Sequence, residues 1–229
     1  MHTGRVEIDT ATTMTTKYEP AGTQAEFESG SRGKVLRNRL GILRVRDMSV
    51  AESHALLFAQ EDAVEKYGTD HRFRASDIRA LHKLWLDPIY PWAGQYRTVN
   101  IGKGGFQFAH TPLIRGLMDV LERGPLRQHT PLKPALDARL AAALAEVHAE
   151  LILIHPFREG NGRLARLLAL LMGFQAGLPP LDFASMAGRG KLRYISAIHA
   201  AAGRNYAPLT AVFARIIAQS RRRAAANNQ

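Results

Sequence analysis

The feature that most constrains the fold is a pair of apolar helical segments in the second half of the chain, joined by a short glycine-containing loop. Apolar residues following Pro134 recur at spacings of three and four, which places them on one face of an α-helix. They are Leu136, Leu140, Leu144, Val147, Leu151 and Ile154. The second segment begins near Gly162 and is apolar on nearly all sides up to Gly177. A helix without a polar face belongs at the centre of a domain, so the pair predicts a helical core.

The remaining pattern predicts an all-α fold with one small β-hairpin. Helical spacing or capping residues predict helices over about 50–67, 75–86 (with Ser76 as a candidate cap), 111–121, 191–202 and 208–222. Pro156 predicts that the helix after Pro134 ends near Ile154. Alternating residues at 99–101 and 106–108 predict a hairpin around 102–105. We expect a mobile arm over 1–33, a single domain over 34–219 and a basic, polar tail over 220–229.

Composition narrows the class of protein. The 229 residues include no cysteine, which excludes disulfides and thiolate metal sites and fits a reducing cytoplasm. No apolar run is long enough to span a bilayer, and the start of the chain lacks a signal-peptide core. We therefore expect a cytoplasmic protein with no membrane partner.

Positive charge is concentrated in the C-terminal third of the chain. The net charge is +11. From Gly160 onward the sequence contains ten basic residues and one acid, Asp182, so this part carries +9. Such a bias favours an anionic partner, which could be a nucleotide, a nucleic acid or an acidic protein. From the charge alone, a solvated basic surface and tail is the favoured explanation.

The segment 155–166, His-Pro-Phe-Arg-Glu-Gly-Asn-Gly-Arg-Leu-Ala-Arg, holds the chemistry. It feeds the N-terminus of the second helix, where free amides and the helix dipole favour an anion. Gly160 and Gly162 allow close approach of a ligand, and Asn161 can cap the helix. Arg163 and Arg166 lie three residues apart on one face, so together they suit a di- or triphosphate.

Two further residues of this segment suggest a reaction rather than simple binding. The Glu159 carboxylate would repel phosphates unless a Mg²⁺ ion lies between them. His155 faces the same loop and could accept a proton from an attacking hydroxyl. Each residue also has a structural explanation, such as a cap, a turn or a Glu159–Arg163 pair. The combination in one loop favours the functional interpretation.

The whole segment resembles the signature of the Fic (filamentation induced by cAMP) family, His-Pro-Phe-x-(Asp/Glu)-Gly-Asn-Gly-Arg-x-x-Arg. The resemblance extends to 36–42, 89–94 and 206–209 and covers roughly Val35 to Ile217. It implies an all-helical Fic core and transfer of AMP from Mg-ATP to a Tyr, Ser or Thr hydroxyl of a target protein. Because the kinase-like Doc relatives replace the Gly-Asn-Gly segment, its presence here favours nucleotidyl transfer.

The resemblance also implies a role for each residue of the site. His155 would be the general base and Glu159 would hold Mg²⁺. Gly160, Asn161, Gly162 and Arg163 would bind the α- and β-phosphates of ATP, and Arg166 the γ-phosphate. The hairpin would be a flap that binds the target, through Ile101, Gly102, Lys103, Gly104, Gly105 and Phe106.

Control of such an enzyme is predicted from a pattern that this sequence lacks. Many Fic enzymes resemble one another in an inhibitory Ser/Thr-x-x-x-Glu-Gly/Asn helix, whose Glu pairs with the arginine matching Arg166. The only Glu followed by Gly or Asn here is Glu159, inside the motif itself, and Thr15-x-x-x-Glu19 is followed by Pro20. We therefore expect a small antitoxin to act in trans.

Two alternative functions stay open at this point. One is a basic nucleic-acid-binding or adaptor protein with a vestigial nucleotide site, although no helix that would read DNA is identifiable. The other is a Fic enzyme that uses another nucleotide donor, because the motif contacts phosphates and not the base. His82, His148, Trp85 and Trp92 are expected to be structural residues of the core.

Overall fold

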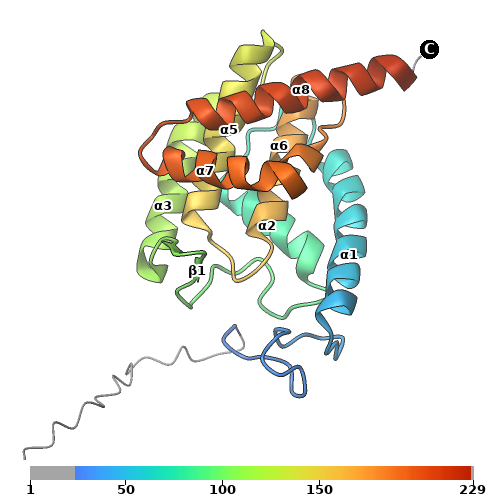
Figure 1. Cartoon of the computed structure of the whole chain (residues 1–229), viewed down its shortest axis with the longest axis vertical. Helices are drawn as coiled ribbons and strands as arrows, with labels where there is room; N and C mark the ends of the chain where they lie inside the picture. Colours follow the sequence, from blue (N-terminus) through green and yellow to red (C-terminus); the bar gives the residue numbers. More distant parts are fainter. Residues whose placement is uncertain (1–23, 228–229) are drawn as a thin grey trace, which may run out of the picture.

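The computed structural model describes residues 24–227, which form a bundle of α-helices with one short hairpin (Figure 1). The first half contains α1 (Val45–Lys66), α2 (Ala75–Leu86), β1 (Gly102–Lys103), β2 (Phe106–Gln107), η1 (Thr111–Leu113), α3 (Ile114–Leu121), η2 (Glu122–Leu126) and α4 (Arg127–His129). The second half contains α5 (Asp137–Ile154), α6 (Asn161–Gln175), η3 (Phe183–Met186), η4 (Gly188–Gly190), α7 (Lys191–Ala202) and α8 (Ala207–Asn227). The expected all-α fold with a small hairpin is confirmed.

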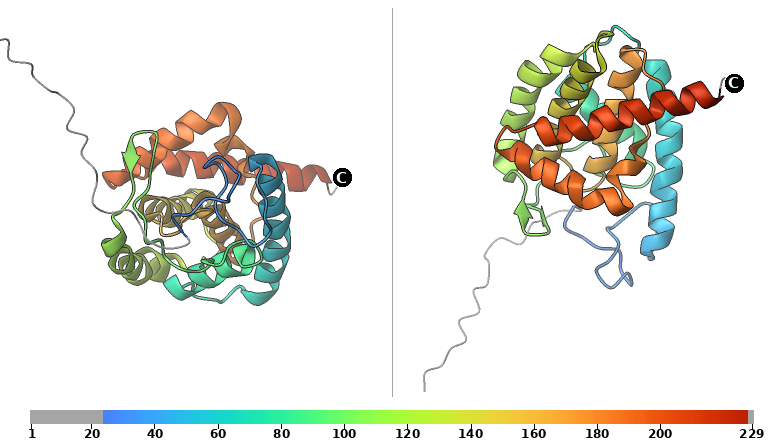
Figure 2. Two further views of the ribbon diagram at one scale, coloured as in Figure 1. Left: turned by 90° about the horizontal axis from the view of Figure 1, so that it is seen from below. Right: turned by 45° about the horizontal axis from the view of Figure 1, so that its top comes forward.

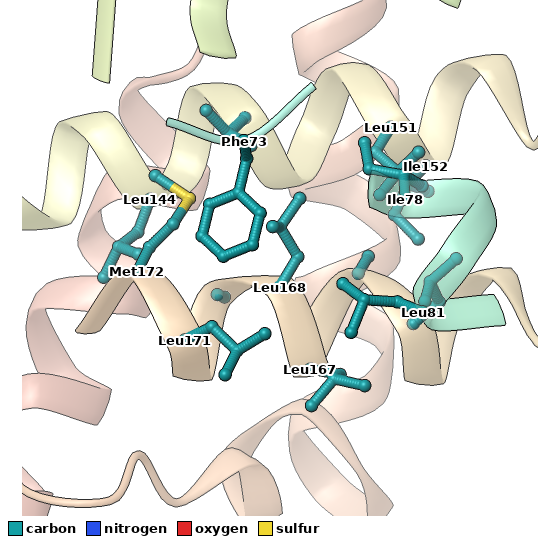
Figure 3. Packing of buried hydrophobic residues seen from close by; sticks show 14 of the residues in the cluster. Phe73, Ile78, Leu81, Leu144, Leu151, Ile152, Leu167, Leu168, Leu171 and Met172 are labelled. Carbon is teal, nitrogen blue, oxygen red and sulfur yellow. The ribbon is translucent and has the colours of Figure 1, made fainter. Parts of the chain in front are cut away.

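Helices α5 and α6 form the centre of the molecule, as their apolar patterns predict. Leu144 and Leu151 of α5 face Leu168 and Met172 of α6 in the core, with Phe73 packed between the helices (Figure 3). Each of these side chains is at most 1% exposed, and burying one stabilises the fold by about 1.5–3 kcal/mol. Helix α8 crosses over α5 on one side, and α2 packs against α6 on the other (Figures 1 and 2). The loop between α5 and α6 is thereby fixed at both ends.

Several predicted element boundaries are corrected by the structure. Helix α2 begins at Ala75, but Ser76 is not its cap, because the Asp77 carboxylate accepts from the Arg74 amide at 2.9 Å. Leu136 lies one residue before α5 and is 75% exposed, so it does not belong to the buried stripe. The helix expected over 111–121 continues through the π-helical turn η2, which contains Pro125, into α4.

The structure adds contacts at both ends of the predicted domain. Residues 24–33 pack with the domain: Gln24 is 5% exposed and its side chain accepts from the Thr98 amide at 2.8 Å. The rest of the predicted arm, with the look-alike Thr15–Glu19 segment, lies outside the described residues. The tail expected from position 220 is helical through Asn227, because α8 continues and Arg221 pairs with Asp137 at 2.9 Å. Within residues 24–227, no helix is long and apolar enough to cross a membrane.

Candidate active site

The loop between α5 and α6 is held in an unusual backbone conformation at both of its ends. His155 follows α5 with φ of 51°, and Gly160 precedes α6 with φ of 83°. A side chain is rare at the first value, and a Cβ at Gly160 would lie 2.7 Å from the Trp85 ring. The turn at Gly160 opens α6, whose Asn161 and Gly162 amides have no hydrogen-bond partner within residues 24–227. These free amides at a helix N-terminus favour an anion.

Asn161 has a different role from the predicted cap. It is the first residue of α6, it is 2% exposed, and Gly160 occupies the cap position. Its side chain accepts from the Phe157 amide at 2.9 Å and donates to the Phe157 carbonyl at 2.8 Å. The Asn161 side chain therefore fixes the loop, and only its backbone amide is available to a ligand.

His155 is oriented as a proton acceptor. Its Nδ1 lies 3.0 Å from the Ile152 carbonyl, which can only accept, so Nδ1 carries the proton and Nε2 holds a free lone pair. Phe108 stacks on the imidazole with ring centroids 3.7 Å apart. Burial lowers the pKa of His155 to about 4, so the ring is neutral near pH 7. A neutral imidazole with a free Nε2 is the form that a general base requires.

Arg97 connects this histidine to the hairpin. Its side chain is buried, and its guanidinium donates to the carbonyls of His155 at 2.7 Å and Val99 at 2.8 Å, and also to that of Ala109. Val99 precedes the hairpin and Ala109 follows it, so one side chain binds both of its ends. The distance between the hairpin and His155 is therefore set by Arg97.

Arg163 is enclosed by residues from α1 and α2. Its Nη2 donates to Glu52 Oε2 at 2.7 Å, and its guanidinium lies over the Trp85 ring, 4.7 Å from the centroid. Glu52 is buried and also accepts from the Tyr90 hydroxyl at 2.7 Å, which explains why its carboxylate tolerates burial. Burial and the Glu52 charge raise the pKa of Tyr90, which keeps its proton.

The side chains of Arg166 and Glu159 keep a guanidinium and a carboxylate oxygen available for a ligand. The Arg166 side chain forms no ion pair or hydrogen bond within the part of the chain that is described, and burial lowers its pKa. A Cβ at Gly162 would lie 3.8 Å from Arg166 Nη1, which places this guanidinium beside the first turn of α6. Glu159 is 46% exposed at its side chain and accepts from the Gly160 amide at 2.8 Å and from Arg163 at 3.4 Å.

The predicted hairpin is present, but its turn is shorter than the sequence pattern suggests. Strands β1 and β2 pair Gly102 with Gln107 and Lys103 with Phe106. Gly104 and Gly105 form a two-residue turn with φ of 58° and 81°, instead of the predicted four-residue loop. At the open end of the ladder the Phe108 amide donates to the Ile101 carbonyl at 3.3 Å, and this end lies beside His155, because Phe108 stacks on its ring. The predicted flap and the predicted base are thus brought together.

Sequence reasoning missed the residues that support the loop from elsewhere. The sequence does indicate Glu52. It is an acid at helical spacing with the apolar Met48, Ala59 and Ala63, on the face of α1 that is buried. Arg97 had none, since nothing in its neighbourhood predicts three carbonyls around its guanidinium. His82 was expected to be structural, and its two ring nitrogens are indeed bonded to Gly94 N at 2.8 Å and Glu159 O at 3.1 Å.

A helical core with this loop at its centre defines the Fic/DOC family, to which the chain belongs: the family model matches residues 72–172. The probable protein adenylyltransferase y4lH of Sinorhizobium fredii is 30% identical over 80% of this chain and 91% of its own length. The protein adenylyltransferase VbhT of Bartonella schoenbuchensis is 30% identical over 70% of this chain and 33% of its own length. The N-terminal Fic domain of a VirB-translocated Bep effector of Bartonella quintana, solved with bound ADP, superposes with a TM-score of 0.65 at 25% identity, covering 83% of this chain and 92% of that chain.

Proposed function

We propose that the protein is a protein adenylyltransferase that transfers AMP from Mg-ATP to a Tyr, Ser or Thr hydroxyl of a target protein. The observation that supports this most directly is a neutral His155 in the same loop as the α6 N-terminus, with Nε2 and the Asn161 and Gly162 amides unbonded within residues 24–227. Relatives named protein adenylyltransferases support the same reaction. Since ATP is the donor, we also propose that the reaction takes place in the cytoplasm.

In the proposed reaction, His155 Nε2 accepts the proton of the target hydroxyl. The hydroxyl oxygen forms a bond to the α-phosphorus of ATP, the bond from that phosphorus to the β-phosphate oxygen breaks, and pyrophosphate leaves. The amides of Asn161 and Gly162, with Arg163, stabilise the α- and β-phosphates from one end of α6. Arg166 binds the γ-phosphate, because its guanidinium has no acidic partner in the described part of the chain, residues 24–227.

The residues present fit a Mg²⁺ ion shared with the nucleotide. Within residues 24–227 no cluster of three metal-binding side chains exists, and Mg²⁺ commonly uses one carboxylate together with substrate phosphates. Glu159 supplies that carboxylate at the edge of the anion site, and half of it is exposed. When bound, the ion would neutralise phosphate charge, while Glu159 holds it and releases the Gly160 amide.

The target segment is proposed to bind along the hairpin. Gly102 to Gly105 are exposed, and each strand has only one neighbour, so the free edge offers backbone groups to an added strand. Main-chain pairing accepts many side chains, which leaves His155 to select the hydroxyl that reaches it. The proposed catalytic unit runs from Gln24, which bonds Thr98 near the hairpin, through α8.

Regulation is proposed to come from a separate protein. Arg166 has no acidic partner within residues 24–227, and the inhibitory pattern is absent from the printed sequence. A small antitoxin that supplies a glutamate to Arg166 would block the γ-phosphate. Expression of the chain alone should then harm its host, and His155→Ala should relieve the harm. Deletion of residues 1–23, which leaves Gln24 in place, should not raise activity; a large rise would show masking in cis.

The function is tested with ATP labelled at the α- or the γ-phosphate, Mg²⁺ and a cell lysate. We expect label from the α-phosphate only, and a loss of about 10²–10⁴-fold in His155→Ala with ATP affinity retained. Label from the γ-phosphate would indicate a kinase and contradict the proposal. Stronger labelling from α-labelled UTP or a CDP-alcohol would show that ATP is not the preferred donor. Salt-sensitive DNA binding without labelling would support a nucleic-acid-binding protein.

A further inference from the structure

The outward face of α1 carries an apolar stripe that nothing in the described structure covers. Val50, Leu57 and Val64 are spaced by seven residues and are 51%, 59% and 45% exposed, and Phe58 beside them is 68% exposed. The opposite face of α1 provides its buried residues, Met48, Glu52, Ala59 and Ala63. The helix therefore has two apolar faces, although it lies at the edge of the molecule (Figures 1 and 2). Exposed apolar residues that recur on one face of a helix are typical of an interaction site.

The charges on this stripe indicate what covers it. Arg46 lies four residues before Val50, and Glu61 lies four residues after Leu57, so all four share the outward face. The spacings from Arg46 to Val50, Leu57 and Glu61 are four, seven and four residues, so the stripe has the same spacing in both directions. Its two ends carry opposite charges. Neither Arg46 nor Glu61 forms an ion pair within residues 24–227. Such a stripe is complementary to its own reversed copy.

We propose that two copies of this chain associate through α1, with the two helices antiparallel about a two-fold axis. In that register Val50 packs on Leu57 of the second copy, and Arg46 lies opposite Glu61 of the second copy. Because the axis repeats each contact, one dimer contains two such apolar pairs and two such ion pairs. The axis passes between Ser53 and His54, both exposed, and Val64 comes opposite the half-exposed Leu43 that precedes the helix.

The charges favour a second copy over an unrelated partner helix. Arg46 and Glu61 are separated by fifteen residues, or about 22 Å of helix, and the antiparallel register brings both pairs together at once. A parallel pairing would instead place each charge beside its like. The interface is a single helix pair, so we expect a weak dimer with a dissociation constant on the order of 10 μM.

The first test measures the mass of the full chain by sedimentation equilibrium from about 1 to about 200 μM. We expect a concentration-dependent dimer, and a monomer for Leu57→Glu over the whole range. Leu192→Glu is the matched control, because Leu192 on α7 is 80% exposed and lies outside the stripe. A wild-type chain that stays monomeric, or equal weakening by both variants, would overturn the proposal. Since both residues are exposed, circular dichroism should show unchanged folding.

A charge exchange tests the register itself. Arg46→Glu and Glu61→Arg should each weaken association about tenfold or more, because each turns two attractive pairs into like-charge pairs. The double variant Arg46→Glu/Glu61→Arg restores both pairs and should associate like the wild type. If the double variant is no tighter than either single variant, the antiparallel pairing is refuted. The readout is association alone, so it is independent of adenylyl transfer.

Discussion

Replacing Arg97 by Met should separate the flap from the general base while leaving the nucleotide site in place. Met retains most of the apolar length of the arginine stem but removes every donor. The carbonyls of His155, Val99 and Ala109 then lose their shared partner inside the protein. His155 is affected most directly, because its backbone is held in a left-handed conformation with φ of 51° and its carbonyl accepts from Arg97.

The size of the effect can be worked out from these contacts. Arg97 is 2% exposed, so water does not replace its guanidinium freely. Three lost hydrogen bonds at about 1–1.5 kcal/mol each amount to roughly 3–4.5 kcal/mol of folding stability. For a domain of this size that corresponds to a fall in Tm of roughly 10 °C. Because native domains are stable by about 5–15 kcal/mol, the variant should still fold at room temperature.

The assay compares three quantities in one preparation: Tm by calorimetry, ATP affinity by titration, and transfer of the α-phosphate label to a target. We expect Tm to fall, ATP affinity to change less than about threefold, and transfer to fall by at least about 100-fold. Arg193→Met is the control, because Arg193 is exposed on α7 and should change none of the three.

Two results would refute this reasoning. If the Tm of Arg97→Met stays within about 2 °C of the wild type, the buried guanidinium does not hold the three carbonyls. If ATP affinity and transfer fall by the same factor, Arg97 supports the whole domain and not the distance between flap and base.

The remaining predictions concern other contacts of the site. Glu52→Gln removes the buried counter-charge of an arginine and should cost about 1–3 kcal/mol in urea unfolding, whereas Glu65→Gln on the exposed side of the same helix should cost nothing measurable. Phe108→Ala opens the His155 ring to water, so the pKa of this base should rise from about 4 towards its ordinary value; the loss of transfer on acidification, which follows protonation of the base, should move to higher pH in a pH–rate profile. Gly160→Ala should lower both Tm and transfer, because φ is 83° and the added Cβ would lie 2.7 Å from a tryptophan ring; an unchanged Tm would contradict the strain.

The parts of the structure that follow from local periodicity could be predicted from the sequence. The 3.6-residue pattern of 140–154 and the all-apolar pattern after Gly162 are properties of single segments, so α5 and α6 were located to within a few residues. Boundaries set by tertiary contacts were not. Leu136 has an apolar side chain but extends into solvent before α5, and α8 continues beyond position 220, where Arg221 pairs with Asp137.

The motif residues divide in the same way. Their chemical types could be read from the sequence, because a helix N-terminus with glycines and arginines favours an anion wherever it occurs. Their directions could not, because the partners come from distant positions: Glu52 from α1 and Arg97 from before the hairpin. Asn161 shows the difference most clearly, since the predicted cap turned out to be a link to Phe157 inside the loop.

The two arginines of the motif look equivalent in the sequence, but their electrostatic surroundings differ. Arg163 is bound by the buried Glu52 and lies 3.4 Å from Glu159, so its positive charge is offset before any ligand arrives. Arg166 has no ion-pair partner within residues 24–227, and burial lowers its pKa, so its charge is partly desolvated. A desolvated, unpaired charge gains more from an anion than one that is already paired. In the proposed reaction, we therefore expect most of the electrostatic attraction for the nucleotide to come from Arg166 and the α6 amides, and Arg163 to contribute mainly direction.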